Sequence, residues 1–132
     1  MLGLDIGDKR IGVSLSDPQG MLASPLTIIG RRDNESDIRA IGEIVGLHQV
    51  ERIIAGLPLS MDGGFSKQTE KVRAFVESLR CGIKVPVEYR DERLSTVSAR
   101  RLMRNGRNKK TGYDDAVAAS IILQSYLDEE AG

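Results

Sequence analysis

The sequence predicts an α/β fold, in which a mixed central sheet carries helices on its faces. Apolar residues alternate with a period of two in several short segments, and they recur with helical spacing in longer ones. Antiparallel strands come first, and helices then alternate with strands, an order that a mixed sheet covered by helices accommodates most simply. The 132 residues suit one domain, so we expect a single domain over residues 1–132.

The N-terminal part of the chain predicts antiparallel strands. Residues 2–6 and 11–16 alternate between apolar and small or polar side chains, and residues 7–10 supply the turn of a hairpin. A third strand is expected at residues 23–29, where Pro25 favours the edge of the sheet.

The remainder of the chain predicts alternating helices and strands. In chain order we expect a helix at residues 37–49 capped by Asn34 or Ser36, a buried strand at 53–55, a helix at 66–80, a strand at 85–89, a short helix from Ser95 or Thr96 to Arg104, and a last helix at 114–128.

Asp5 is a charged residue within an otherwise apolar strand, between Gly3 and Gly7. A strand carboxylate that leaves water is costly unless it is paired, hydrogen-bonded or bound to a cation. Asp5 on a solvent-exposed face is the alternative, but the two glycines argue against it because they leave room for a ligand. Asp5 is therefore the first candidate metal ligand.

Two more acidic centres follow. Asp91 and Glu92 end the strand at 85–89, where α/β sheets commonly place binding groups, and alternation leaves open which of them faces the site. Pairing with neighbouring arginines is their alternative role. Asp114 and Asp115 begin the last helix, and because Asp115 shares its apolar stripe, we expect Asp114 to be the cap and Asp115 to face the sheet.

Carboxylates from three parts of the chain could converge on one anionic pocket. Such a cluster is unfavourable when empty and favourable around a divalent cation, and phosphodiester hydrolysis suits a site of this kind. A single cysteine and a single histidine exclude a thiolate-rich zinc site, so Mg²⁺ or Mn²⁺ is the expected cofactor. The candidate metal ligands are Asp5, Asp91, Glu92 and Asp115.

The formal net charge is zero, but the charges are unevenly distributed. Residues 100–110 hold six basic and no acidic side chains, which indicates either a solvated helix face or a strip that binds nucleic-acid phosphates. The candidate phosphate-binding residues are Lys9, Arg10, Arg93, Arg100, Arg104 and Arg107.

Membrane attachment is not expected. No apolar segment approaches the ~20 residues of a membrane span, and the N-terminus lacks the pattern of a signal peptide, which predicts a cytoplasmic protein. We expect Cys81 to be a small buried residue after a helix, and His48 to lie late in one.

Four stretches, in this order, resemble the YqgF/RuvX family, pre-16S rRNA nucleases that are also described as Holliday junction resolvase-like. They are residues 3–13 (GLDIGDKRIGV), 56–63 (GLPLSMDG), 91–96 (DERLST) and 115–127 (DAVAASIILQSYL).

The resemblance implies an RNase H-like fold and a single RNase H-like nuclease domain over the whole chain. It also implies a metal-dependent hydrolase that matures the 5′ end of 16S ribosomal RNA, a step of ribosome biogenesis. The family's catalytic positions fall on Asp5, Glu92 and Asp115, and the preference for Glu92 over Asp91 rests on the resemblance alone. RNA is favoured over DNA as the partner, and a monomer or weak homodimer is expected.

Three alternatives stay open. The first is a junction-cleaving DNA endonuclease. The second is a catalytically silent nucleic-acid-binding domain, against which the three carboxylates weigh. The third is an actin-like nucleotide-binding domain, whose first hairpin is similar but which binds nucleotide between two such domains.

Overall fold

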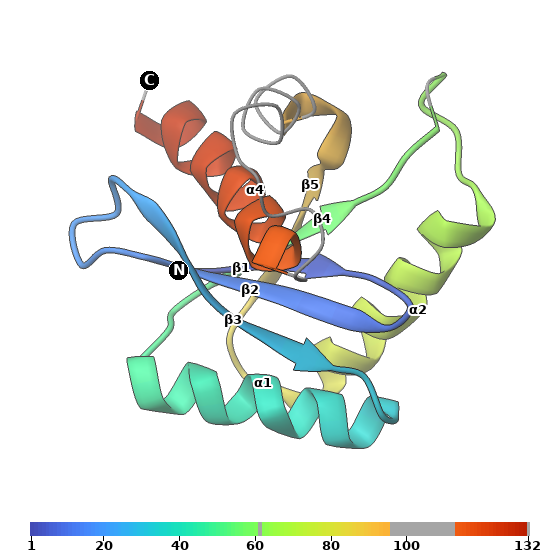
Figure 1. The fold of residues 1–132 in the computed structure, drawn as a ribbon, viewed down its shortest axis with the longest axis horizontal. Helices are drawn as coiled ribbons and strands as arrows, with labels where there is room; N and C mark the ends of the chain where they lie inside the picture. Colours follow the sequence, from blue (N-terminus) through green and yellow to red (C-terminus); the bar gives the residue numbers. More distant parts are fainter. Residues whose placement is uncertain (61, 96–112, 132) are drawn as a thin grey trace.

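Five strands form one mixed sheet in the order β3-β2-β1-β4-β5 in the computed structural model (Figure 1). The structure describes residues 1–60, 62–95 and 113–131, with the side chains in these ranges except those of residues 94, 95, 113, 114 and 131. The strands are β1 (Leu2–Ile6), β2 (Arg10–Ser16), β3 (Ala23–Gly30), β4 (Ile53–Leu57) and β5 (Val87–Asp91). The β1–β2 and β2–β3 pairs are antiparallel, whereas the β1–β4 and β4–β5 pairs are parallel.

Helices cover both faces of this sheet, which confirms the predicted architecture. Helices α1 (Asn34–His48) and α2 (Lys67–Gly82) lie on one face, and α4 (Tyr113–Ala131) crosses the other (Figure 1). A short 3₁₀ helix, η1 (Glu92–Ser95), follows β5 directly. None of the helices in the described ranges is both long and apolar enough to span a bilayer.

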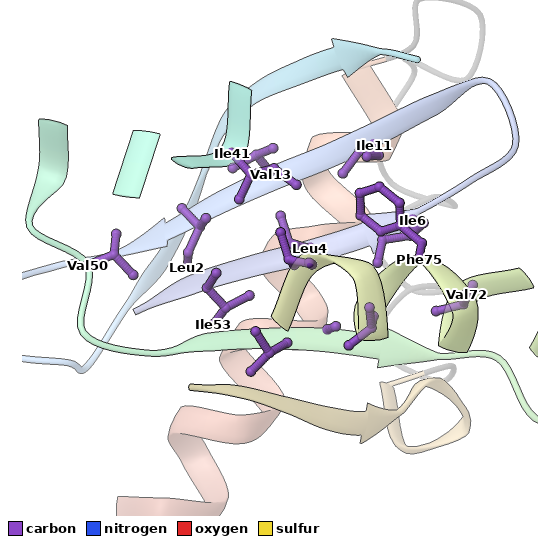
Figure 2. Packing of buried hydrophobic residues seen from close by; sticks show 14 residues of the cluster. Leu2, Leu4, Ile6, Ile11, Val13, Ile41, Val50, Ile53, Val72 and Phe75 are labelled. Carbon is purple, nitrogen blue, oxygen red and sulfur yellow. The ribbon is translucent and has the colours of Figure 1, made fainter. Parts of the chain in front are cut away.

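The main hydrophobic core lies between the sheet and helices α1 and α2 (Figure 2). Every second residue of β1 and β2 points into it, and each fully buried aliphatic or aromatic side chain contributes about 1.5–3 kcal/mol. The principal contributors are Leu2, Leu4, Ile6, Ile11, Val13, Ile41, Val72 and Phe75.

The opposite face of the sheet carries small residues beneath α4. A Cβ atom on Gly3 would lie 2.8 Å from the Cβ of Leu123, and one on Gly12 would overlap the carbonyl oxygen of Asp115. The Ser14 hydroxyl donates a 2.9 Å hydrogen bond to the carbonyl of Ala119. Helix α4 can therefore approach the sheet closely, because Gly3 of β1 and Gly12 of β2 have no side chains.

Several predicted boundaries and burials were wrong. Asp33 caps α1, accepting a 2.8 Å hydrogen bond from the Ser36 amide, so neither Asn34 nor Ser36 is the cap. Helix α4 begins at Tyr113, which puts Asp114 in its first turn instead of at the cap. Cys81 is exposed, because α2 continues to Gly82 and keeps this residue within its solvent-facing last turn.

Strand β5 differs from its predicted bounds, whereas β3 lies where it was expected. Strand β5 covers Val87–Asp91 instead of residues 85–89; Pro86 precedes it and contributes only its carbonyl, which accepts from the Ile53 amide. Strand β3 is an edge strand, as Pro25 indicated. The predicted helix that ends at Arg104 lies almost entirely outside the described residues.

Candidate active site

Asp5 lies on the α4 face of the sheet. Its strand pairs it with Gly12 of β2, and residues directly opposite each other in an antiparallel pair point to the same face. Because Gly12 has no side chain, the first turn of α4 packs against β2 beside Asp5. The Asp5 side chain is only partly exposed. The charge that looked anomalous in the strand therefore lies under a helix N-terminus.

The course of β5 decides which of the two later acidic residues faces Asp5. The strand continues through Arg90, whose guanidinium Nε donates to the Ser125 hydroxyl of α4 at 3.2 Å, and ends at Asp91. Glu92 begins η1 and lies on the α4 face, because a Cβ atom on Gly56 would come 2.9 Å from its Cγ atom and 2.6 Å from Cδ1 of Ile122 in α4. There the Glu92 and Asp5 carboxyl groups share a side-chain hydrogen bond.

Asp91 points elsewhere. Its Oδ2 lies 2.7 Å from Nη2 of Arg93, and its Oδ1 accepts from the Arg93 backbone amide at 2.9 Å. These contacts lower the pKa of Asp91, because Arg93 stabilises its charged form. The structure thus brings Glu92 to Asp5 and joins Asp91 to Arg93.

Asp115 approaches the pair from the N-terminal turn of α4. The residues four and seven positions later, Ala119 and Ile122, are buried against the sheet, as the predicted stripe requires. Its Oδ2 accepts a hydrogen bond from Nε of Arg10 at 2.6 Å. The negative charge of Asp115 raises the pKa of Asp5, so the two carboxylates interact electrostatically.

Burial is the main cause of the raised pKa values of Asp5 and Glu92. It raises the pKa of Asp5 to about 6 and that of Glu92 to about 7, and repulsion from nearby carboxylates adds to both shifts. Their hydrogen bond requires a proton on one of the two carboxyls, and repulsion between two charged carboxylates favours keeping that proton. Below about pH 7 the pair therefore retains a proton.

The basic candidates are only partly brought to the site. Arg10 contacts Asp115, Lys9 is exposed in the β1–β2 turn, and Arg93 pairs with Asp91. Arg100, Arg104 and Arg107 lie outside the described residues.

Two residues that support the site were missed in the sequence. Arg31 donates to the nearly buried Asp37 carboxylate at 3.1 Å and to the Gly7 carbonyl at 3.0 Å, which ties the β1–β2 turn to α1. No sequence pattern singles it out. Gly56 lies beneath Glu92, since a Cβ atom there would come 2.9 Å from the Glu92 Cγ atom. In the sequence, the position of Gly56 directly before Leu57 and Pro58 indicated a loop. It did not indicate that a residue without a side chain was needed beneath Glu92.

The donor set fits a hard divalent cation. Asp5, Glu92 and Asp115 offer only carboxylate oxygens, which Mg²⁺ and Mn²⁺ prefer. Within residues 1–60, 62–95 and 113–131, no three acidic, histidine or cysteine side chains are grouped ready to hold a metal ion. In the metal-free protein, the negative charge of the three carboxyls is instead reduced by a proton on the Asp5–Glu92 pair and by the Arg10 guanidinium on Asp115.

Solved structures identify the class of fold. The Thermus thermophilus RuvC in complex with a Holliday junction substrate matches all of this chain and 98% of its own length, with a TM-score of 0.65 and 12% identity. Fowlpox virus resolvase, solved with junction DNA, matches with a TM-score of 0.56 and 14% identity over 99% of this chain and 98% of its own. The fold is RNase H-like, as predicted.

The chain belongs to the RuvX family, described as Holliday junction resolvase, whose profile matches residues 1–129. A protein of Dehalococcoides mccartyi is 48% identical over 125 residues, which cover 94% of each chain. One of Caldanaerobacter subterraneus subsp. tengcongensis is 45% identical and covers 98% of this chain and 96% of its own. Both are provisionally named pre-16S rRNA nucleases.

Proposed function

We propose that this chain is a metal-dependent nuclease that hydrolyses a phosphodiester bond of nucleic acid, with Asp5, Glu92 and Asp115 as its catalytic metal ligands. The observation that carries the proposal is the partly buried Asp5–Glu92 carboxyl pair. Two carboxyls buried together destabilise a fold at neutral pH unless a cation binds them, and perturbed carboxyls of this kind are typical of functional sites.

Mg²⁺ or Mn²⁺ is the proposed cofactor, because every proposed ligand is a carboxylate. Bound there, the cation would supply Lewis-acid stabilisation of the charge that develops on the phosphate. The side chains would hold it and must first give up the proton that the Asp5–Glu92 pair shares. Asp91 is not among the proposed ligands, because its carboxylate binds Arg93.

RNA is the proposed substrate, specifically the precursor of 16S ribosomal RNA, processed in the cytoplasm. Relatives that match nearly the full length of the chain and carry that provisional name support this choice. We propose one nuclease domain over residues 1–132, acting as a monomer or weak homodimer. Lys9, Arg10 and the basic residues between 100 and 110 are proposed to contact backbone phosphates.

Cleavage of a four-way DNA junction is the second candidate function. The description of the family as Holliday junction resolvase favours it. Both candidates use the same hydrolytic chemistry, so they differ in substrate and not in the metal-binding residues.

A side-by-side assay of precursor ribosomal RNA and a four-way DNA junction, with Mn²⁺ or Mg²⁺, separates the two. We expect metal-dependent cuts in the RNA and an intact junction, and no cuts with EDTA. Junction cleavage alone would favour the second candidate. Tight ATP binding without cleavage of either substrate would contradict the proposal and favour a nucleotide-binding domain.

A further inference from the structure

Arg10 reaches the candidate active site from the strand next to Asp5. It is the first residue of β2, and alternation puts it on the same face as Gly12 and Ser14, the face that α4 covers. Its Nε atom lies 2.6 Å from Oδ2 of Asp115. A guanidinium thus holds an oxygen of a carboxylate proposed to bind a divalent cation.

The side chain of Arg10 is free to take other partners. It is 53% exposed, compared with 30% for Asp115, and among the described residues its Nη1 and Nη2 atoms make no hydrogen bond. The backbone beneath it is fixed by contrast, because the Arg10 carbonyl accepts from the Gly7 amide at 2.9 Å and Arg31 binds the Gly7 carbonyl. Arg10 can therefore leave Asp115 by side-chain rotation alone.

A divalent cation and a guanidinium compete for one carboxylate, because each neutralises the same charge. A displaced guanidinium needs another anion, and its planar fork of donors matches the oxygens of a phosphate. The phosphate of a substrate brought to the neighbouring carboxylates is such an anion.

We propose that Arg10 exchanges partners: it binds Asp115 when the site holds no metal, and a backbone phosphate of the nucleic acid once a divalent cation has taken Asp115. This inference rests on the proposed function and adds a coupling to it. Metal and nucleic acid bind cooperatively, because the cation releases Arg10 from Asp115 and Arg10 then binds the phosphate. Metal-free protein holds nucleic acid less tightly.

The first test compares Arg10→Gln with Arg39→Gln, a control in an exposed ion pair on α1 with Glu35. Calorimetric titration with Mn²⁺ alone should give about fivefold tighter binding for Arg10→Gln, because a competing charge is gone. Binding of a short single-stranded RNA with Ca²⁺, followed by fluorescence anisotropy and checked for intact RNA, should weaken about fivefold. The slope of the logarithm of the RNA binding constant against the logarithm of the salt concentration should become shallower by about 0.7. The control should match wild type in all three measurements.

A double-mutant cycle gives the second test. Asp115→Asn should raise RNA affinity without metal, because it releases Arg10, and combining it with Arg10→Gln should remove that gain. A gain that persists in the double variant would mean that only repulsion from Asp115 was relieved, and would overturn the exchange.

The outcomes separate the inference from the proposed function. Wild type that binds Mn²⁺ while Arg10→Gln behaves like Arg39→Gln would overturn the exchange alone. Wild type that binds no Mn²⁺ would overturn the proposed function and the exchange with it.

Discussion

The carboxyl groups of Asp5 and Glu92 hydrogen-bond to each other across an intervening strand. Asp5 belongs to β1 and Glu92 follows β5, and β4 lies between these two strands in the sheet. Gly56 of β4 makes the contact possible, since a Cβ atom there would lie 2.9 Å from Cγ of Glu92. A missing side chain on the central strand thus allows two acids from distant segments to meet.

The metal-free protein should lose stability as the pH rises. The folded-state pKa values of Asp5 and Glu92 are raised to about 6 and about 7, above the ordinary values of 3.8 and 4.5. Between about pH 4 and pH 7 the folded chain therefore binds more protons than the unfolded chain, and its free energy of unfolding falls as these protons are lost. Urea unfolding in EDTA should give a higher midpoint at about pH 5 than at about pH 8.

Neutral replacements of the pair provide the control for that pH dependence. Asp5→Asn and Glu92→Gln should each raise the free energy of unfolding at about pH 8 by about 1 kcal/mol and flatten its pH dependence. Glu35→Gln, at an exposed position on α1, should leave the pH dependence unchanged. Equal slopes for wild type and Asp5→Asn would show that the pair does not govern stability.

Divalent metal should stabilise the protein, and more strongly at higher pH. Protons and cations compete for the same carboxylates, so binding strengthens as the pH rises through about 7. At a concentration of Mn²⁺ about 100 times the dissociation constant, the gain should be about 2.7 kcal/mol. Thermal unfolding with Mn²⁺ or EDTA measures it, and Asp5→Asn should abolish it. An identical melting temperature with and without Mn²⁺ at about pH 8 would count against the metal site.

Asp91 and Glu92 should differ sharply on substitution, although they are adjacent. Glu92→Gln removes a proposed metal ligand and should lower the cleavage rate at least about 100-fold. Asp91→Asn weakens only the contact with Arg93 and should lower the rate by less than about fivefold. Single-turnover cleavage of the two variants measures the difference, and the reverse order would make Asp91 the ligand.

Gly12 should not tolerate a side chain. A Cβ atom there overlaps the backbone of Asp115, so Gly12→Ala must displace the start of α4, at a cost of about 1–3 kcal/mol and with loss of activity. Gly42 in α1 is the matched control, because a Cβ atom there meets nothing within 4 Å. Gly42→Ala should stabilise the chain by about 0.5–1 kcal/mol. Urea unfolding compares the two, and equal effects would contradict close packing of α4 on β2.

Much of the fold could be predicted because the periodicity of the chain is strong. The alternation in residues 2–6 and 11–16 already separated the apolar face of the sheet from the face with Asp5. The helix caps were harder to predict, since Asp33, Asn34 and Ser36 are all capable of capping α1. Only the hydrogen bond from the Ser36 amide to the Asp33 carboxylate identifies Asp33 as the cap.

The site was less predictable than the fold. Asp5 and Asp115 could be singled out from strand and helix patterns, but the orientation of Glu92 depends on how far β5 extends, which its sequence does not reveal. The ion pair between Arg10 and Asp115 joins residues 105 positions apart, and no local pattern encodes such a contact. Gly56 matters through an absent atom, which becomes meaningful only once Glu92 lies above it.

The most direct measurement is cleavage of precursor 16S ribosomal RNA by wild type and by Asp5→Asn, purified in parallel, with Mn²⁺ and with EDTA. We predict that wild type cuts the RNA only with metal, and that Asp5→Asn, although folded and at least as stable at about pH 8, cuts at least about 100-fold more slowly. Metal-dependent cleavage that survives undiminished in Asp5→Asn would contradict it.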